Sequence, residues 1–397
     1  MKAKSFLSKT LLNVTPSMHK IRRLSLLATV ESAVNGASLS VTGLGRNIEN
    51  KAKEKHRIKR VDRLCNNINL QSEINGIYKK MNSLLVSSHS TPIILVDWSD
   101  LDARKEHFLL RASLATQGRS LTLYEEVHPA SRKEKPEVHS QFMNILKAML
   151  PSTCRPIVIS DAGFRIPWFR LIESLDWDYI GRVRGSTKCK RKQDITWFPI
   201  KGLYEKATRK SKDLGIYQQG LRQLFESRLV IVKRKPIGRK DKTATGEKSR
   251  MCKASRDCAK REQEPWLLAT SLSSRKDIAK KVRRLYATRM QIEESFRDVK
   301  TGLNMNAGDT RILKRLSILL LVALLAQYLL FVLGLAVKSS QKHRQYQANS
   351  VKKNNVLSNQ FIGLRAYKDK YLKLLTKHWV AAIEALKQLI LEPKACC

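Results

Sequence analysis

Two aspartates in this sequence each stand at the end of a short apolar run, a position from which a carboxylate can do chemistry. Asp97 ends the run Pro92-Ile-Ile-Leu-Val, and Asp161 ends the run Arg155-Pro-Ile-Val-Ile-Ser. Both runs predict buried strands, and ligand sites in α/β sheets form beyond the carboxyl ends of strands. Two carboxylates in one crevice repel each other unless a cation lies between them, and oxygen-only ligands suit Mg²⁺ or Mn²⁺. One such aspartate alone would be interpreted as a turn or helix-cap residue, but the pair favours a metal site.

A third acid is predicted on a helix that spans roughly Arg275 to Lys300. One face of this helix carries a phenol, a guanidinium, a carboxylate and an ammonium group, from Tyr286, Arg289, Glu293 and Lys300. At about 100° per residue these side chains fall within an arc of about 60°, whereas Glu294 and Asp298 point away from it. The competing interpretation is a solvated charged face, in which Arg289 and Glu293 simply form an i,i+4 pair.

The charge of the chain indicates its partner. Lys and Arg number 76 against 34 Asp and Glu, which gives a formal net charge of +42 over 397 residues. Such an excess repels itself unless a polyanion is near, so nucleic acid is the leading partner. An anionic membrane surface is the second alternative, and a host whose proteins are all basic is the third.

Cysteine usage points to a reducing compartment. The seven cysteines have no Cys-x-x-Cys spacing, and Cys252 and Cys258 lack a paired His motif, which argues against zinc. A disulfide framework is not expected in a chain of this length, which points to a reducing cytoplasm. With nucleic acid as the leading partner, we expect a cytoplasmic protein associated with the nucleoid. The basic N-terminus lacks the apolar stretch of a signal peptide.

The segment Leu316 to Val337 is apolar enough to raise the question of a membrane. Its 22 residues could span a bilayer, but basic residues flank it on both sides and therefore give no orientation. A helix that is apolar all round is also what the centre of a large soluble domain needs. We therefore predict a buried core helix and no membrane association, with a membrane span as the alternative.

Residues 1–90 predict a helical DNA-binding domain. Apolar residues recur at helical spacing over Ile21–Ala33 and Arg57–Leu70, and a basic run occupies Lys51–Arg60. A solvated basic linker is the alternative interpretation of that run.

Strand patterns begin at Thr91 and predict a mixed α/β core in two parts. The first part, 91–184, holds both aspartate-ending strands, a hairpin over 108–127, a helix over 137–150, a short helix over 168–175 and a strand over 179–183. The second part, 266–310, holds a strand at 266–270 and the helix that carries Glu293.

A basic insertion is predicted to separate these two parts. Between Gly181 and Pro265 there are 25 Lys or Arg against 9 Asp or Glu. We expect residues 185–265 to be rich in strands, with a mobile portion near 236–262. Residues 311–397 should form a helical C-terminal region.

The spacing Tyr-x2-Arg-x3-Glu-x6-Lys resembles the YREK signature of the IS-four type of bacterial insertion-sequence transposases. The surrounding segments are also similar to that family, namely Pro92–Asp100, Gly118–Glu125, Ser160–Arg165, Arg182–Gly185 and Met290–Asp298. The similarity runs from about residue 10 to beyond residue 350. The segment 301–308 departs from the family pattern.

This resemblance implies a ribonuclease-H-like catalytic core and a DDE triad of Asp97, Asp161 and Glu293 that binds Mg²⁺, for which Mn²⁺ can substitute. It implies that Tyr286, Arg289 and Lys300 grip phosphates at the transposon end. Two further roles follow: Trp266 matches a tryptophan that stacks on a flipped base in a related transposase, and Met290 matches a side chain that fills the space left by that base. A core aromatic is the alternative for Trp266.

The family further implies cut-and-paste transposition of an insertion sequence, with strand cleavage, hairpin formation and strand transfer. The partners would be the terminal inverted repeats, target DNA and a second copy of the chain in a synaptic homodimer. Two alternatives stay open: a structure-selective DNA nuclease on the same core, and an inactive DNA-binding repressor of transposition.

Overall fold

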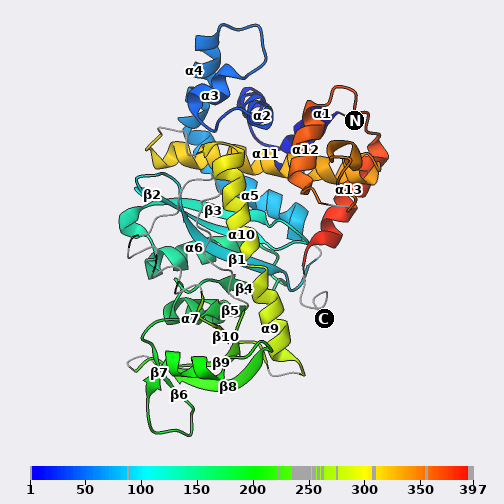
Figure 1. The fold of residues 1–397 in the computed structure, drawn as a ribbon. Coiled ribbons are helices and arrows are strands. Elements are labelled where there is room, and N and C mark those ends of the chain that lie inside the picture. The colour runs from blue at the N-terminus through cyan, green and yellow to red at the C-terminus, as the bar shows by residue number, and fades with distance from the viewer. Residues whose placement is uncertain are drawn as a thin grey trace. The chain divides into compact units, whose positions relative to one another are not determined.

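The computed structural model of the chain describes residues 2–86, 89–221, 224–234, 263–273, 276–305, 310–353 and 356–391, together with Cys252, Arg256 and Lys260. The fold divides into two compact units (Figure 1). Met1–Cys154 and Met290–Glu392 form the first unit, and Arg155–Arg289 form the second. Both units combine strands with helices, which confirms the predicted α/β class.

The first unit begins with five helices: α1 (Ala3–Val14), α2 (Lys20–Val34), α3 (Val41–Arg46), α4 (Glu54–Cys65) and α5 (Ile68–Val86). The helix expected over Ile21–Ala33 lies within α2. The helical spacing over Arg57–Leu70 belongs to two helices, because α4 ends and α5 begins inside that range. The side chain of Asn67 accepts a hydrogen bond from the N–H of Leu70 at 2.8 Å and so caps a new helix.

Three antiparallel strands form the sheet of the first unit in the order β3-β2-β1: β1 (Ile93–Asp100), β2 (His107–Leu114) and β3 (Leu121–Pro129). The predicted hairpin is β2 and β3. A short 3₁₀ turn, η1 (Ala130–Arg132), leads to α6 (Pro136–Met149), the helix expected over 137–150. Pro136 suits the first turn of that helix, because the N–H groups of a first turn have no acceptor within the helix and proline, which has no N–H, therefore breaks no hydrogen bond there.

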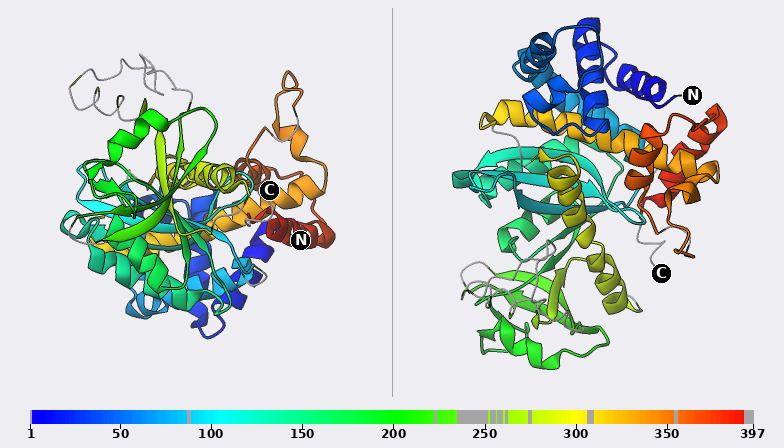
Figure 2. Two further views of the ribbon diagram at one scale, coloured as in Figure 1. Left: turned by 90° about the horizontal axis from the view of Figure 1, so that it is seen from below. Right: turned by 45° about the horizontal axis from the view of Figure 1, so that its top comes forward.

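The C-terminal part of the first unit is helical. It contains α10 (Met290–Arg297), the π-helical turn η3 (Asp298–Gly302), α11 (Leu313–Ser339), η5 (His343–Tyr346), α12 (Asn359–Lys368) and α13 (Thr376–Leu389). Helix α11 lies between the N-terminal helices and the β1–β3 sheet (Figures 1 and 2). In the most apolar 18-residue stretch of α11, 94% is buried inside the protein. The prediction of a buried core helix is therefore confirmed.

Helix α12 crosses α11 at two glycines. A Cβ added to Gly334 of α11 would overlap the carbonyl oxygen of Asn359, and one added to Gly363 of α12 would overlap that of Leu330. Only glycine allows backbones to approach this closely. The core of the first unit therefore depends on these two positions as well as on apolar burial.

The second unit is a mostly antiparallel sheet with helices. Its strands are β4 (Ile157–Ser160), β5 (Asp178–Arg182), β6 (Lys188–Lys190), β7 (Phe198–Pro199), β8 (Lys212–Gln219), β9 (Phe225–Val232) and β10 (Trp266–Thr270). Their order is β4-β5-β10-β9-β8-β6-β7, and β4 and β5 run parallel. The helices are α7 (Ile166–Ser174), η2 (Ile200–Lys206) and α9 (Ile278–Ala287).

Strands β6 to β9 fall inside the range predicted as the basic insertion, and they continue the sheet from β10 outward. The portion near 236–262 that we expected to be mobile lies almost wholly outside the described residues.

Candidate active site

The helix that was expected to carry four site residues is interrupted. Helix α9 ends at Ala287 and α10 begins at Met290, so the single helix predicted over 275–300 is wrong. The N–H groups of Thr288 and Arg289 turn back to the carbonyls three residues before them, each at 3.1 Å. The Thr288 hydroxyl donates to the carbonyl of Leu285 at 2.7 Å, a local bond that competes with the helical ladder.

This interruption changes the predicted arc of side chains. Tyr286 and Arg289 belong to the second unit, whereas Glu293 and Lys300 belong to the first. Lys300 lies in the π-helical turn η3, where the angle per residue differs from that of an α-helix. A regular helical wheel therefore does not describe the four residues as one face.

Asp97 lies on β1 in a row of charged residues that crosses the sheet of the first unit. It is paired in register with Arg111 of β2, which is paired with Glu125 of β3. Residues directly opposite each other in antiparallel strands present their side chains on the same face. Asp97 is 9% exposed, and its carboxylate accepts a hydrogen bond from the N–H of Trp98 at 2.8 Å.

Helix α10 packs on that face of the sheet. Arg111 donates to the hydroxyl of Ser295 at 2.8 Å, and its guanidinium lies 4.9 Å from the ring centroid of Phe296. Glu293 is a half-buried residue of the same helix. The first unit thus supplies two of the three predicted acids, Asp97 and Glu293, from two elements that pack together.

Beneath α10 lies a buried ion pair that sequence reasoning missed. The Arg111 guanidinium donates to the Glu125 carboxylate at 2.7 Å, and the two side chains are 0% and 1% exposed. Tyr78 of α5 donates to the other Glu125 oxygen at 3.1 Å. No local pattern reveals this pair, because it depends on the register of β2 against β3.

Lys300 forms an ion pair with Asp100, the last residue of β1. Both side chains are partly exposed. Asp100 was not among the predicted site residues. Its signal was present in the sequence, since it lies three residues beyond Asp97 at the same strand end.

The opposite side of β1 is fixed by an aromatic contact next to Asp97. The indole Nε1 of Trp98 donates to Nε2 of His139 at 3.0 Å. Burial lowers the pKa of His139 to about 4, so its imidazole is neutral near pH 7 and can accept this bond. This contact holds the strand end that carries both Asp97 and Asp100.

Asp161 follows β4 in the second unit and lines a cleft of about 910 Å³. One of its carboxylate oxygens accepts a hydrogen bond from the N–H of Gly163 at 2.7 Å, which shapes the turn after the strand. The other charged residues around the cleft are mostly cations, and they include Arg165, Arg182, Arg184 and Lys201.

Among the described residues that line this cleft, Glu264 is the one acid besides Asp161, and its carboxylate is already paired with cations. Its carboxylate lies 3.4 Å from Arg184 and 3.5 Å from Lys201, and its backbone carbonyl accepts from Arg182 at 3.2 Å. Glu264 therefore orients the cations without cancelling all of their charge. The cleft combines a strand-end carboxylate with a basic lining.

Trp266 and Tyr286 pack against each other in the second unit. Their ring centroids are 4.8 Å apart and the rings are nearly perpendicular, at 78°. Trp266 is half-buried, whereas Tyr286 is 3% exposed. The guanidinium of Arg234 lies 4.4 Å from the indole centroid. Met290 of the first unit is exposed.

The donor set fits a hard divalent cation, because all three predicted ligands are carboxylates. Across the described part of the chain, no three His, Cys, Asp or Glu side chains gather into a metal-binding group.

A family model described as the transposase DDE domain matches residues 88–329, more than half of the chain. The matched range contains every residue that we predicted for the site. No curated protein matches this chain.

Proposed function

Because this chain belongs to the family of transposases with a DDE domain, we propose that Asp97, Asp161 and Glu293 are its catalytic triad. The family makes the protein a nuclease and strand transferase that acts on DNA, with a core of the ribonuclease-H-like kind. The observation that carries the proposal is the position of the acids. Asp97 and Glu293 lie on two elements that pack together, and Asp161 lies on a basic cleft.

The three carboxylates are proposed to hold Mg²⁺, for which Mn²⁺ can substitute. When bound, a pair of such ions would activate the attacking hydroxyl and stabilise the leaving oxygen of an in-line displacement at phosphorus. The fixed strand end supports this role for Asp97, since a ligand must be held in place before the cation arrives.

The cleft around Asp161 is proposed to bind the DNA backbone next to the cleaved bond. Arg165, Arg184 and Lys201 supply positive charge there, and the net charge of +42 attracts DNA from a distance. Tyr286, Arg289 and Lys300 are proposed to contact phosphates of the transposon end. The ion pair between Lys300 and Asp100 supports the phosphate contact proposed for Lys300, because it holds the ammonium group at the end of β1, where a bound phosphate would also interact with it.

The reaction order follows from the finer resemblance, to the IS-four type and to the transposase of transposon ten. Water attacks the phosphorus at the end of the element, and the bond to the 3′ oxygen breaks to leave a 3′-OH. That 3′-OH attacks the opposite strand, which closes a hairpin and releases the flanking DNA. Water reopens the hairpin, and the same 3′-OH attacks target DNA.

Hairpin closure requires a sharply bent strand, and extrusion of one base relieves the strain. We propose that Trp266 stacks on the extruded base and that Met290 fills the space left behind. The partial exposure of Trp266 supports the first role, and the exposed side chain of Met290 supports the second. The enzyme is proposed to act as a homodimer that bridges two inverted repeats, in the cytoplasm and on the nucleoid.

A strand-transfer assay tests the proposal. The protein is incubated with Mg²⁺, a labelled DNA end carrying a free 3′-OH and a supercoiled plasmid. Joined products in which the label is covalently attached to the plasmid are the expected result. Cleaved but unjoined DNA would indicate a structure-selective nuclease, and binding without cleavage would indicate a repressor of transposition; either result contradicts the proposal.

A further inference from the structure

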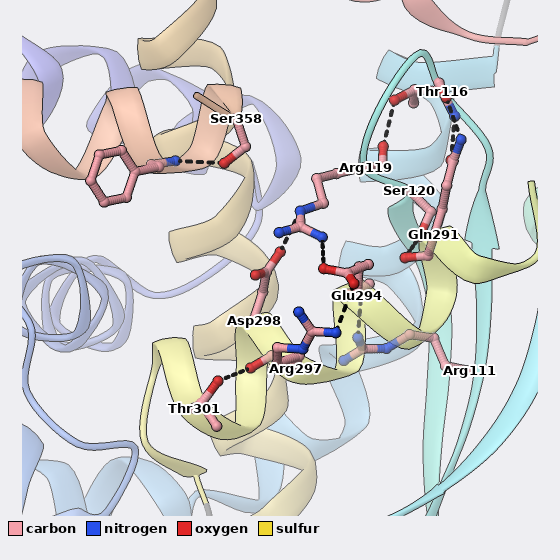
Figure 3. Close-up of polar contacts among 12 residues, drawn as sticks. Arg111, Thr116, Arg119, Ser120, Gln291, Glu294, Arg297, Asp298, Thr301 and Ser358 are labelled. Carbon is pink, nitrogen blue, oxygen red and sulfur yellow. Dashed lines mark hydrogen bonds and ion pairs between the residues drawn. The ribbon is translucent and has the colours of Figure 1, made fainter. Parts of the chain in front are cut away.

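Two sequence segments that the catalytic triad leaves unexplained meet in the first unit. One is 118–125, which turns from the β2–β3 loop into β3, and the other is 290–298, which forms α10 and the start of η3. Figure 3 shows the side chains of the loop turned toward those of the helix. Their contacts are polar and specific.

Gln291 binds the loop as a neighbouring strand would. Its amide nitrogen donates to the carbonyl of Thr116 at 2.7 Å, and its amide oxygen accepts from the N–H of the same residue at 3.1 Å. The hydroxyl of Ser120 donates to the backbone carbonyl of Gln291 at 3.2 Å (Figure 3). The first turn of α10 is thereby bound to the loop at three points.

Arg119 binds the second turn of the same helix. Its guanidinium pairs with Glu294 and lies 3.3 Å from the Asp298 carboxylate (Figure 3). Arg297 also pairs with Glu294, at 2.7 Å, but from the outer side, where its own side chain is 63% exposed.

These contacts occupy one face of the helix. Gln291, Glu294 and Asp298 follow one another at intervals of three and four residues, the spacing of neighbours on a helix surface. Glu293 lies about 200° around the helix from Gln291 and therefore outside this stripe. The loop can hold the helix without competing for the proposed catalytic carboxylate.

Helix α10 needs such an anchor. It has 8 residues, and isolated helices of that length are not stable in water. The interruption at Thr288 separates it from α9, and η3 follows at its other end. Its position must therefore come from contacts with the rest of the first unit.

We propose that Thr116, Arg119 and Ser120, with Gln291, Glu294 and Asp298, form a hairpin clamp that positions α10 and thereby the Glu293 carboxylate. This inference rests on the proposed role of Glu293. The clamp residues are positioning residues, because they act on the reaction through the placement of another side chain. Misplacement of a catalytic group by about 1 Å costs on the order of a hundredfold in rate.

Two variants test the clamp, Arg119→Met and Gln291→Met, with Arg297→Met as the matched control. The control removes an arginine that lies on α10 itself and pairs with the same Glu294 carboxylate, but that makes no contact with the loop. For each variant, amide hydrogen exchange is measured in peptides covering α10 and α12, and cleavage and gel-shift binding of a transposon end are measured in parallel. Arg119→Lys serves as the conservative version.

We expect both clamp variants to speed exchange in α10 by about tenfold, the scale of one lost charge-assisted bond in Arg119→Met or of two lost neutral bonds in Gln291→Met, with no change in α12. Cleavage should fall about ten- to a hundredfold while end binding stays within about twofold. Arg119→Lys should restore part of the cleavage, and Arg297→Met should change neither readout by more than about twofold.

Unchanged exchange in α10, or equal acceleration in α10 and α12, would overturn the clamp. The variant Glu293→Gln, measured beside the others, separates this inference from the proposed function. If Glu293→Gln stops cleavage but a loosened α10 still cleaves at the wild-type rate, the clamp has no positioning role. If Glu293→Gln itself cleaves normally, the proposed triad is wrong.

Discussion

The two units use their charged side chains in different ways. In the first unit, Arg111 and Glu125 are buried against each other, and Arg119 is paired with Glu294 and Asp298. In the second unit, Lys201 is 55% exposed and lines a cleft of about 910 Å³. Internal ion pairs hold carboxylates in place, whereas cations on an open cleft are available to a phosphate backbone. Under the proposed function, the internal ion pairs of the first unit would help to place Asp97 and Glu293, and the exposed cations of the second unit would contact the DNA backbone beside Asp161.

Removal of one partner of the buried pair should give the largest effect on stability. Arg111→Met leaves the Glu125 carboxylate buried without its cation, which costs about 3–5 kcal/mol. The double variant Arg111→Met/Glu125→Met should recover most of that loss, because it leaves no charge to bury. Thermal or urea unfolding measures both, and equal losses in the single and double variants would contradict the account.

A smaller loss of stability is expected at the crossing of α11 and α12. Gly334→Ala inserts a methyl group where the carbonyl of Asn359 already lies, and overpacking of this kind costs about 1–3 kcal/mol. Gly76→Ala in α5 is the matched control, since its added Cβ meets nothing within 4 Å. The control should be stabilised by roughly 0.5–1 kcal/mol. Loss of stability in the control, or none in Gly334→Ala, would show that the close approach does not matter.

In the second unit, Trp266→Ala should separate two chemical steps and leave end binding largely intact. Base stacking on an aromatic ring is worth roughly 1–3 kcal/mol, so hairpin closure should slow by about five- to a hundredfold while the first nick proceeds. An abasic or mismatched nucleotide at the flipped position should partly rescue closure. If Trp266 is instead a core residue, its loss should lower the melting temperature and both steps together, and no altered nucleotide should help.

The smallest predicted effect is on the salt dependence of DNA binding. Lys201→Ala should lower the slope of log affinity against log salt by about 0.9, the value for one phosphate contact. Lys377→Ala removes the same charge from an exposed position on α13 and should leave the slope unchanged. Equal slopes for wild type and Lys201→Ala would remove the cleft from the proposed DNA path.

Much of this arrangement was predictable from the sequence, because the signals are local. The strand that carries Asp97 and the strand that precedes Asp161 are marked by apolar runs, and the core helix α11 is marked by its continuous apolarity. The expected end of the first strand at Asp97 is wrong, because β1 continues to Asp100. The division between α4 and α5 also had a local signal, the capping side chain of Asn67, which the periodicity obscured.

Other features depend on information that no short window contains. The pairing of Arg111 with Glu125 requires the register of two strands, and the hairpin clamp joins residues 175 positions apart. The helix is interrupted at Thr288 although no glycine or proline, the residues that usually mark a helix break, lies near that position. The association of Lys300 with Asp100 likewise arises only when η3 reaches the end of β1.

The central claim is the proposal that Asp97, Asp161 and Glu293 act as one catalytic triad. The most direct test measures cleavage of a transposon end in Mg²⁺ by Asp97→Asn, Asp161→Asn and Glu293→Gln, with end binding measured by gel shift. Asp176→Asn, in an exposed turn of the second unit, is the control. Each triad variant should lose about a thousandfold or more in cleavage, the scale of a lost catalytic group, while binding stays within about twofold and the control cleaves normally. Near-wild-type cleavage by any one of the three would contradict the claim for that residue and for the triad as a whole.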